Sequence, residues 1–544
     1  MSRLLIGSSE FAEYCKKNAI FVDKTHFIEE FIESFAKIEL ILRPRRFSKS
    51  TNLSMLKSFF TIGTDKSMFK GLKIYENYEL MDKYCGEYPV VFLDLKNVIG
   101  ETWELTLLEL WKQMRLCAAM HKDAYRKMGT DPFAVCEKYL ERNVSCPDLH
   151  ILGSSLFNIT YDLYQYYGRE VIVLIDEYDT PLNNAHRLGF YDKAAKFFAS
   201  FYSEGLKGNN AVEKACIMGI AELRCEGLPV GLNNLSVNSF STESYSSCFG
   251  FTIDEIKENF EVTDNDIERL KEWYIGYYFG GDQVINPWSI VNWWDNEKSF
   301  NSYWIQTCQT VELGKFLGGN ELKMLYPLFY LLYEGDSYEI ELSRTAVNYN
   351  NEWKLENIMT FLVLTGYLTY NENKVRIPNK EVKDYWKVHL LPQFNKVVKN
   401  KYGRRIQDLF MRDNLDVKVL TDIMTDTLMH TSAYDLVTEA SYHCFFVGVF
   451  MACLNSEYED ITISSNKEAG REMYGINIKL FKPKKVCIFG FKHVHSERDL
   501  NPQVALQQIK EKQNYHMYQG LGYSIHLVGV SCYQKTLALA IDEL

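Results

Sequence analysis

The segment Arg43–Ser50 has the side-chain types of a loop that binds the phosphates of a nucleotide. The segment Ile38-Glu-Leu-Ile-Leu42 before it predicts a buried strand, and apolar residues after it recur at helical spacing. A phosphate loop requires this order of strand, tight loop and helix, because the free N–H groups of the first helical turn then face the phosphates. We expect Lys49 to contact the β- and γ-phosphates and Ser50 to place its hydroxyl on Mg²⁺.

Both glycine positions of the usual phosphate-loop pattern hold other residues in this chain. Arg43 stands at the first position and Ser48 at the second. The Cβ atom of a serine makes a positive φ angle, or a close approach to phosphate, harder than it is for glycine. The loop is therefore eroded relative to the pattern. Arg45, Arg46 and Thr51 complete the set expected near the nucleotide, and the two arginines either contact phosphate or brace the loop.

Two acidic residues follow a fully apolar run. Val171–Ile175 predicts a central strand of a parallel sheet, and it leads directly into Asp176 and Glu177. An acid at the carboxyl end of such a strand is where Mg²⁺ is held in phosphate-loop enzymes. We expect Asp176 to hold Mg²⁺ together with Ser50, and Glu177 to orient the attacking water as the catalytic residue. A solvated Asp-Glu pair at the start of a loop is the competing interpretation.

The elements around these residues predict an α/β domain over residues 1–285. Pro89–Leu95 and Cys216–Ile220 predict further strands, and Thr102–Met120 predicts a helix. Strands that alternate with helices are typical of a layered domain with a parallel sheet. This sheet would carry the phosphate loop and the two acids at the ends of its strands.

Two further regions follow along the chain. The pattern over 286–415 is mainly helical, and we expect a helical middle region there. Over 416–544 a helix precedes a probable hairpin of Ile476–Phe481 and Val486–Phe491, and a second helix and a strand follow it. This order predicts a smaller α/β domain at the end of the chain.

Composition limits the classes of function. The net charge of -11 argues against bulk electrostatic binding of nucleic acid, although it allows a local basic groove. The longest apolar run is too short to span a bilayer, and the first residues have no signal-peptide pattern, so we expect an intracellular protein, cytoplasmic or nuclear, that does not contact a membrane. The 13 cysteines include no C-x-x-C pair, which makes a zinc ribbon or a redox motif improbable. The sequence does not predict an oligomeric state.

Several phrases of the chain occur in the order of a known family. They are Phe21–Thr25, Arg43–Ser50, Leu174–Pro181, Trp273–Tyr277 and Asn286–Ser289. With them the chain resembles the AAA-ATPase-like proteins that carry a C-terminal PD-(D/E)XK nuclease domain. The resemblance implies a P-loop NTPase-type sheet that uses ATP and Mg²⁺, and a restriction-endonuclease-like α/β domain at the end of the chain.

The same resemblance marks a departure in the first half. The family has an arginine where this chain has Glu222, and the resemblance implies that this arginine senses the γ-phosphate; Arg224 lies two places further on. A glutamate that faces phosphate would repel it, so hydrolysis, and even nucleotide binding, is weakened if Glu222 occupies that place. A shifted Arg224 would restore the positive charge.

The resemblance also locates a remnant of the nuclease site. The metal-binding aspartate position falls on Gly475 and the glutamate position on Gly490, while Lys492 remains and Glu439 matches the family's upstream acid. PD-(D/E)XK chemistry needs acids on two adjacent strands to hold Mg²⁺, and glycine has no side chain that could do so. The resemblance therefore implies a nuclease fold without its metal site.

Two hypotheses of different classes follow. The first is an ATP-binding protein, with ATPase activity that is weak at most, whose nuclease domain is inactive. The second is a pseudoenzyme that has neither activity and binds protein or nucleic acid as a scaffold. A working ATP-dependent nuclease would need alternative acids, and the sequence does not offer them.

Overall fold

The computed structural model divides the chain into two compact units. The first comprises Met1–Gln306 and Ile340–Glu381, and the second comprises Thr307–Glu339 and Val382–Leu544. The structure describes residues 7–17, 19–129, 149–223, 235–304, 328–329, 331–333, 335, 337–342, 346–347, 355–387, 402–429, 438–454, 461–467, 474–513 and 515–544. In these ranges no helix is both long and apolar enough to cross a membrane.

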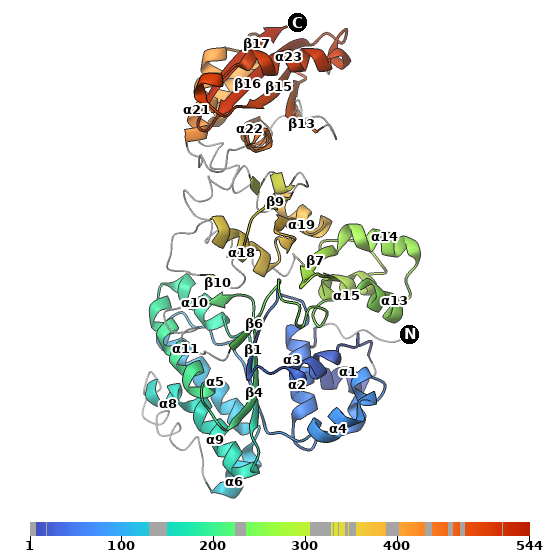
Figure 1. Cartoon of the computed structure of the whole chain (residues 1–544), viewed down its shortest axis with the longest axis vertical. Coiled ribbons are helices and arrows are strands. Elements are labelled where there is room, and N and C mark those ends of the chain that lie inside the picture. Colours follow the sequence, from blue (N-terminus) through green and yellow to red (C-terminus); the bar gives the residue numbers. More distant parts are fainter. Residues whose placement is uncertain are drawn as a thin grey trace. The chain divides into compact units, whose positions relative to one another are not determined.

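The first unit is built on a five-stranded sheet in the order β2-β3-β4-β1-β6, and every neighbouring pair is parallel (Figure 1). Its strands are β1 (Ile38–Leu42), β2 (Val90–Asp94), β3 (Val171–Asp176), β4 (Val212–Gly219) and β6 (Leu235–Asn238). The carboxyl ends of parallel strands meet at one edge of a sheet. Because β4 lies between β1 and β3, the loop after β1 and the acids after β3 are separated at that edge by a single strand.

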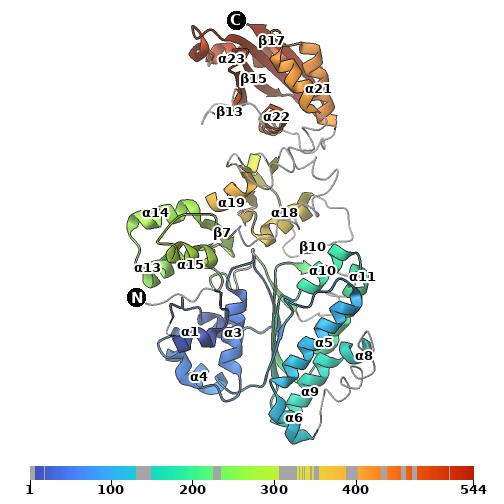
Figure 2. The same ribbon diagram turned by 180° about the vertical axis from the view of Figure 1, so that it is seen from behind.

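Helices cover both faces of this sheet, as Figures 1 and 2 show from opposite sides. One face carries α1 (Phe11–Lys17), α2 (His26–Glu33), α3 (Lys49–Phe60) and α4 (Tyr78–Tyr84). The other carries α5 (Trp103–Ala119), α6 (Lys122–Met128), α8 (Leu149–Gly153), α9 (Ser155–Tyr167), α10 (Thr180–Leu188) and α11 (Tyr191–Leu206). Every residue of β1 and β3 is buried, which explains why both strands are largely apolar, with Glu39 the one charged residue of β1 and Asp176 that of β3.

The rest of the first unit forms an aromatic layer next to the phosphate loop. It contains β5 (Glu222–Leu223), α13 (Ile253–Asn259), α14 (Asp264–Trp273), β7 (Ile275–Phe279), β8 (Asp282–Ile285), α15 (Pro287–Asp295), β10 (Ala346–Val347), α18 (Leu355–Thr365), β11 (Thr369–Asn371) and β12 (Lys374–Arg376). Phe47 of the loop is fully buried, with its ring centroid 5.0 Å from that of Tyr277 and 5.2 Å from that of Phe279. The loop is thus anchored to this layer by an apolar side chain.

The second unit contains a mixed five-stranded sheet in the order β13-β14-β15-β16-β17. Its strands are β13 (Ile461–Lys467), β14 (Tyr474–Leu480), β15 (Lys485–His493), β16 (Ser524–Tyr533) and β17 (Thr536–Glu543). Only the β15–β16 pair is parallel, and α23 (Pro502–Lys512) connects these two strands. Phe489 packs on Phe450 of α22 (Glu439–Leu454), while Ile488 packs with Leu506 of α23, so the two helices cover opposite faces.

The expected fold class is confirmed, since a parallel sheet with helices and a C-terminal mixed sheet are both present. The predicted strand Ile38–Leu42 has the same bounds in the structure, and the C-terminal hairpin, helix and strand also form. Sequence patterns did not predict β13 or β17, which lie at the edges of the second sheet. The region 286–415, expected to be mainly helical, also holds the β11–β12 hairpin, and parts of it belong to each unit.

Candidate functional site

The phosphate loop keeps a backbone conformation that usually requires glycine. Ser48 has φ 61° and ψ 21°, and Arg46 has a φ of 70°, both in the left-handed region. This conformation costs an L-residue about 1–2 kcal/mol. The serine at the second glycine position therefore does not prevent the turn that leads into α3, although it makes that turn strained.

Arg43 at the first glycine position is turned away from the loop into the protein core. It is fully buried, and it donates hydrogen bonds to the carbonyl oxygens of Leu42, Asn238, Ser239 and Tyr245. Its guanidinium also lies over the rings of Phe249 and Phe279. Burial lowers the pKa of Arg43 to about 10, so it stays charged at neutral pH. This arginine ties the end of β1 to the end of β6.

The next residues of the loop are braced by tryptophans. The Arg46 guanidinium lies 4.1 Å from the centroid of the Trp288 ring, and Trp304 Nε1 donates to the carbonyl oxygen of Arg45 at 3.2 Å. These contacts support the interpretation in which Arg45 and Arg46 brace the loop. Thr51 lies half-buried in the first turn of α3.

Lys49 lies under the loop with its ammonium group held by the loop's own carbonyls. Its Nζ donates to the oxygens of Arg43 and Pro44, both at 2.9 Å, and the residue is 4% exposed. Desolvation lowers the pKa of Lys49, while the charges of Glu177, Asp176 and Asp179 act in the opposite direction. The lysine of α3 and the acids after β3, far apart in the sequence, therefore share one electrostatic environment.

Asp176 meets Ser50 at the same edge of the sheet. The residue is 3% exposed, and burial followed by the charge of Glu177 raises the pKa of Asp176 to about 6, while a hydrogen bond from Ser50 lowers it. The two residues predicted to hold Mg²⁺ are thus near enough to affect one another. Asp94 ends the neighbouring strand in register with Asp176 and also acts on its pKa. Sequence reasoning missed Asp94, although its place at the end of an apolar run was a usable signal.

Glu177 is the first residue after β3, and it has a positive φ of 52°. Its backbone N–H donates to Asp176 Oδ1 at 3.0 Å, and Thr180 Oγ1 donates to Glu177 Oε2 at 3.3 Å. Such a conformation costs a non-glycine residue of order 1–3 kcal/mol and is common at functional sites. Because of this positive φ, the Glu177 side chain points in a different direction from the one it would take if β3 continued.

Asp179 is a second acid that the sequence analysis missed. It is fully buried, and its carboxylate accepts hydrogen bonds from the backbone N–H groups of Ile220 at 3.1 Å and Ala221 at 3.4 Å. Burial and the charge of Glu177 raise the pKa of Asp179 to about 6. A Cβ atom on Gly219 would come within 2.9 Å of the Asp179 carboxylate, so glycine permits this close approach. Asp179 couples the acidic loop to the end of β4.

Glu222 directly follows Ile220 and Ala221, the two residues that donate to Asp179. It is in β5, which pairs in parallel with β10, and it is 8% exposed. Among the described residues, its Oε2 has no hydrogen-bond partner. Arg224, the alternative source of positive charge, lies outside the described residues.

In the second unit, the four remnant positions of the nuclease site lie together at one end of β14 and β15. Gly475 and Gly490 are register partners across the two strands. Lys492 Nζ is 2.7 Å from Glu439 Oε1, so these two retained residues form an ion pair. His443 of α22, which sequence reasoning missed, places Nε2 3.1 Å from the carbonyl oxygen of Gly475. The family's two carboxylate positions are opposite one another, without side chains.

Comparisons with known proteins agree with this architecture. Residues 5–229 match a family model described as predicted AAA-ATPase, and residues 437–540 match one of the PD-(D/E)XK nuclease superfamily. The chain is also similar to a protein of Azotobacter chroococcum mcd 1 described as "Uncharacterized protein in vnfD 5'region". The two are 25% identical over 559 residues, which cover 97% of this chain and 96% of that protein. The resemblance inferred from the motifs is confirmed for both domains.

Proposed function

We propose that this chain, which joins an AAA-ATPase-like domain to a PD-(D/E)XK superfamily domain, binds ATP with Mg²⁺ through Lys49, Ser50 and Asp176. The observation that carries the proposal is the interaction of Ser50 with Asp176 beside the buried Lys49. Ser50 and Asp176 lie in distant parts of the sequence of the first domain. If Lys49 and Ser50 only began a solvated helix, and Asp176 and Glu177 were only a solvated acid pair, these residues would have no reason to lie together in a buried place.

The residues present fit a magnesium nucleotide. A serine hydroxyl and a carboxylate are the hard oxygen ligands that Mg²⁺ prefers, and the bound ion would neutralise phosphate charge. Lys49 would exchange the carbonyl oxygens of Arg43 and Pro44 for the β- and γ-phosphates, while N–H groups of the first turn of α3 contact phosphate oxygens. Glu177 would accept a hydrogen bond from the attacking water. Because Ser48 is strained and Glu222 brings a buried acid near the end of β4, we expect slow hydrolysis at most.

We propose further that the C-terminal domain does not cleave nucleic acid. Its edge offers two glycines where the family has metal-binding carboxylates, and Lys492 is engaged by Glu439. This donor set does not fit Mg²⁺, so no metal-dependent step can be assigned to it.

A scaffold with neither activity is the second candidate, and the Lys492–Glu439 ion pair favours it. In an active nuclease of this type the lysine acts near the attacking water. Here its charge is already matched by the acid 2.7 Å away. The domain would then serve as a folded surface that binds a protein or a nucleic acid.

Isothermal titration calorimetry with ATP and Mg²⁺ separates the two candidates. The native chain should bind in the micromolar range, and Lys49→Ala should lose ten- to a hundredfold in affinity, since a hydrogen bond to a charged group is worth about 1.5–3 kcal/mol. Lys57→Ala, on the same helix but in its last turn, is the matched control and should bind as the native chain does. No binding heat with the native chain would leave only the scaffold.

Two activity assays complete this test. Phosphate release should be slow, and it should disappear in Glu177→Gln while calorimetric ATP affinity is kept, because only the orientation of water is lost. Plasmid and single-stranded DNA should remain intact with Mg²⁺ or Mn²⁺. Cleavage of either DNA by the native chain would contradict the assignment of the second domain.

A further inference from the structure

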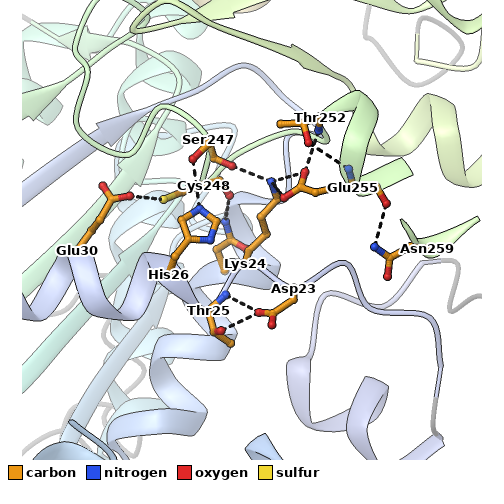
Figure 3. Close-up of polar contacts among 11 residues, drawn as sticks. Asp23, Lys24, Thr25, His26, Glu30, Ser247, Cys248, Thr252, Glu255 and Asn259 are labelled. Carbon is orange, nitrogen blue, oxygen red and sulfur yellow. Dashed lines mark hydrogen bonds and ion pairs between the residues drawn. The ribbon is translucent and has the colours of Figure 1, made fainter. Parts of the chain in front are cut away.

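A cluster of three potential metal ligands lies behind the phosphate loop, away from the residues assigned to the nucleotide. His26 and Glu30 are four residues apart on α2 and so share one face of that helix. Cys248 comes from a segment more than two hundred residues later and is fully buried. One ligand atom of each residue lies within 4.8 Å of the other two. Figure 3 shows the Cys248 sulfur pointing to the Glu30 carboxylate, with the His26 ring beside it.

Hydrogen bonds hold the backbone around the cluster in place. Asn52 Nδ2, from α3, donates to the carbonyl oxygen of Cys248 at 2.8 Å. The backbone N–H of Tyr245 donates to Glu30 Oε2 at 2.8 Å, which leaves the other carboxylate oxygen free to face the thiol. Lys24 Nζ donates to the carbonyl oxygen of Ser247 at 2.7 Å. The backbone on which these ligands stand is therefore held from both sides before any ion arrives.

The charges around the cluster allow a cation. The nearby ammonium of Lys24 is paired with Glu255 at 2.6 Å, so its charge is already matched (Figure 3). Cys248 Sγ is 3.3 Å from Glu30 Oε1, a contact in which the thiol proton lies between sulfur and carboxylate. A metal ion in that place would take over the role of the proton with more charge. Arg43 is the remaining cation nearby, and its guanidinium is occupied by four carbonyl oxygens.

We propose that His26, Glu30 and Cys248 bind a zinc-class divalent cation. Imidazole, carboxylate and thiolate are ligands that Zn²⁺ combines in four-coordinate sites, with Zn–S near 2.3 Å and Zn–N or Zn–O near 2.0–2.2 Å. Those bond lengths put ligand atoms roughly 3.3–3.7 Å apart, which side-chain rotations can reach from the present spacing. On binding, the S–H bond of Cys248 breaks, a metal–sulfur bond forms, and the proton leaves to solvent. The fourth position falls to a water or to the Ser247 hydroxyl.

This site would be structural and independent of the nucleotide. It would join α2 to the segment 245–248. In that segment the carbonyl oxygen of Tyr245 accepts a hydrogen bond from Arg43, and the carbonyl oxygen of Cys248 accepts one from Asn52. Both partners belong to the strand–loop–helix that carries Lys49. The bound ion would therefore stabilise the folded first unit, and removing it would loosen the support behind the phosphate loop.

Cobalt titration of the full chain tests the proposal. Co²⁺ replaces Zn²⁺ in such sites, and a cobalt–thiolate bond gives a charge-transfer absorption that imidazole and carboxylate alone cannot give. The native chain, first stripped with a chelator, should show this band at one equivalent, and Zn²⁺ should abolish it. Cys248→Ser should remove the band, and His26→Ala should weaken cobalt binding at least tenfold. Absence of the band in the native chain would overturn the proposal.

Controls account for the other cysteines and histidines and for misfolding. Cys117→Ser and His121→Ala replace residues outside the cluster, and both should keep the native band. Lys49→Ala should keep it as well, so a failed nucleotide proposal and a failed metal proposal give different results. Zn²⁺ should raise the melting temperature of the native chain but not that of Cys248→Ser, which differs by one atom. A band that persists in Cys248→Ser would assign the metal to another thiol and contradict the site.

Discussion

At the predicted phosphate loop and at the β14–β15 edge, this chain departs from the patterns of the families that it resembles, and the two departures differ in kind. At the loop, glycine serves a conformation, and Ser48 adopts that conformation with φ 61°. At the edge, the missing residues serve as ligands, and Gly475 and Gly490 have no side chain to replace them. A protein can absorb a lost conformation at the cost of strain, whereas it cannot replace a lost ligand by any rearrangement of the backbone.

The lysines of the two regions, Lys49 and Lys492, also differ in the groups that hold them. Lys49 is held only by carbonyl oxygens of its own loop, with the acids after β3 close by, so a phosphate could displace those carbonyls. Lys492 is paired with a carboxylate, which is a stronger partner for an ammonium group. The first lysine is held by neutral carbonyl groups, and the second is paired with a charged carboxylate.

The largest expected effect is a gain of metal binding at the β14–β15 edge. Gly475→Asp with Gly490→Glu would place two carboxylates on paired positions, whose Cβ atoms lie about 4.5–5.5 Å apart. Calorimetry should show one more Mn²⁺ site in the double variant than in the native chain. Each single variant is the matched control and should bind at least tenfold more weakly. A Cβ atom on Gly475 would be 3.3 Å from the Phe489 oxygen, so the strand needs only a small adjustment. A double variant that folds and binds no more Mn²⁺ than the native chain would show that more than two side chains were lost.

The second effect concerns pH and Asp176. Burial raises the pKa of Asp176 to about 6, above the value of about 3.9 in an unfolded chain. A raised carboxyl pKa gives stability that is fully present below about pH 4 and is lost as the pH rises through about 6, a change on the order of 2 kcal/mol. Melting curves should show the nucleotide-free native chain losing stability relative to Asp176→Asn between pH 4 and pH 7. If the two proteins change in parallel, Asp176 is not desolvated as described.

The third effect concerns Ser50. Ser50→Ala removes one ligand of Mg²⁺ and the hydrogen bond to Asp176, so the affinity for ATP with Mg²⁺ should fall about tenfold. Ser58→Ala, at the other end of α3, should leave the affinity unchanged. Without Mg²⁺ the native chain and Ser50→Ala should bind ATP almost equally. An equal loss with and without Mg²⁺ would assign Ser50 to the phosphates rather than to the ion.

The smallest effect tests the strain at Ser48. Ser48→Gly relieves the left-handed conformation, which costs an L-residue about 1–2 kcal/mol, but the greater freedom of glycine in the unfolded chain offsets part of that gain. The free energy of unfolding should rise by up to about 1 kcal/mol. Ser58→Gly, in a regular helical turn, should lower it by about the same amount. A loss of stability in both variants would mean that the loop depends on the Ser48 side chain itself.

Much of the fold could be predicted because the relevant patterns are local. Val171–Ile175 is apolar throughout and Ile38–Leu42 is apolar except for Glu39, and the residue types after each strand indicate the chemistry. The edge strand β13 was missed because most of its residues are polar. The edge strand β17 has the apolar run Leu537–Ile541 and was missed because an edge strand is identified by its partner rather than by its own pattern. Asp94 and Asp179 were missed since an acid after a strand gains meaning only from its neighbours in the sheet.

The sequence by itself predicted a phosphate loop, an acidic strand end and a nuclease-like fold with glycines at its metal positions, and the two domain types are confirmed. Each of these depends on residue type and spacing along one segment. Only the tertiary structure decided that Ser50 meets Asp176, that Arg43 turns into the core, and that His26, Glu30 and Cys248 converge. These outcomes depend on strand order and on contacts across as many as two hundred residues, and no local pattern encodes them.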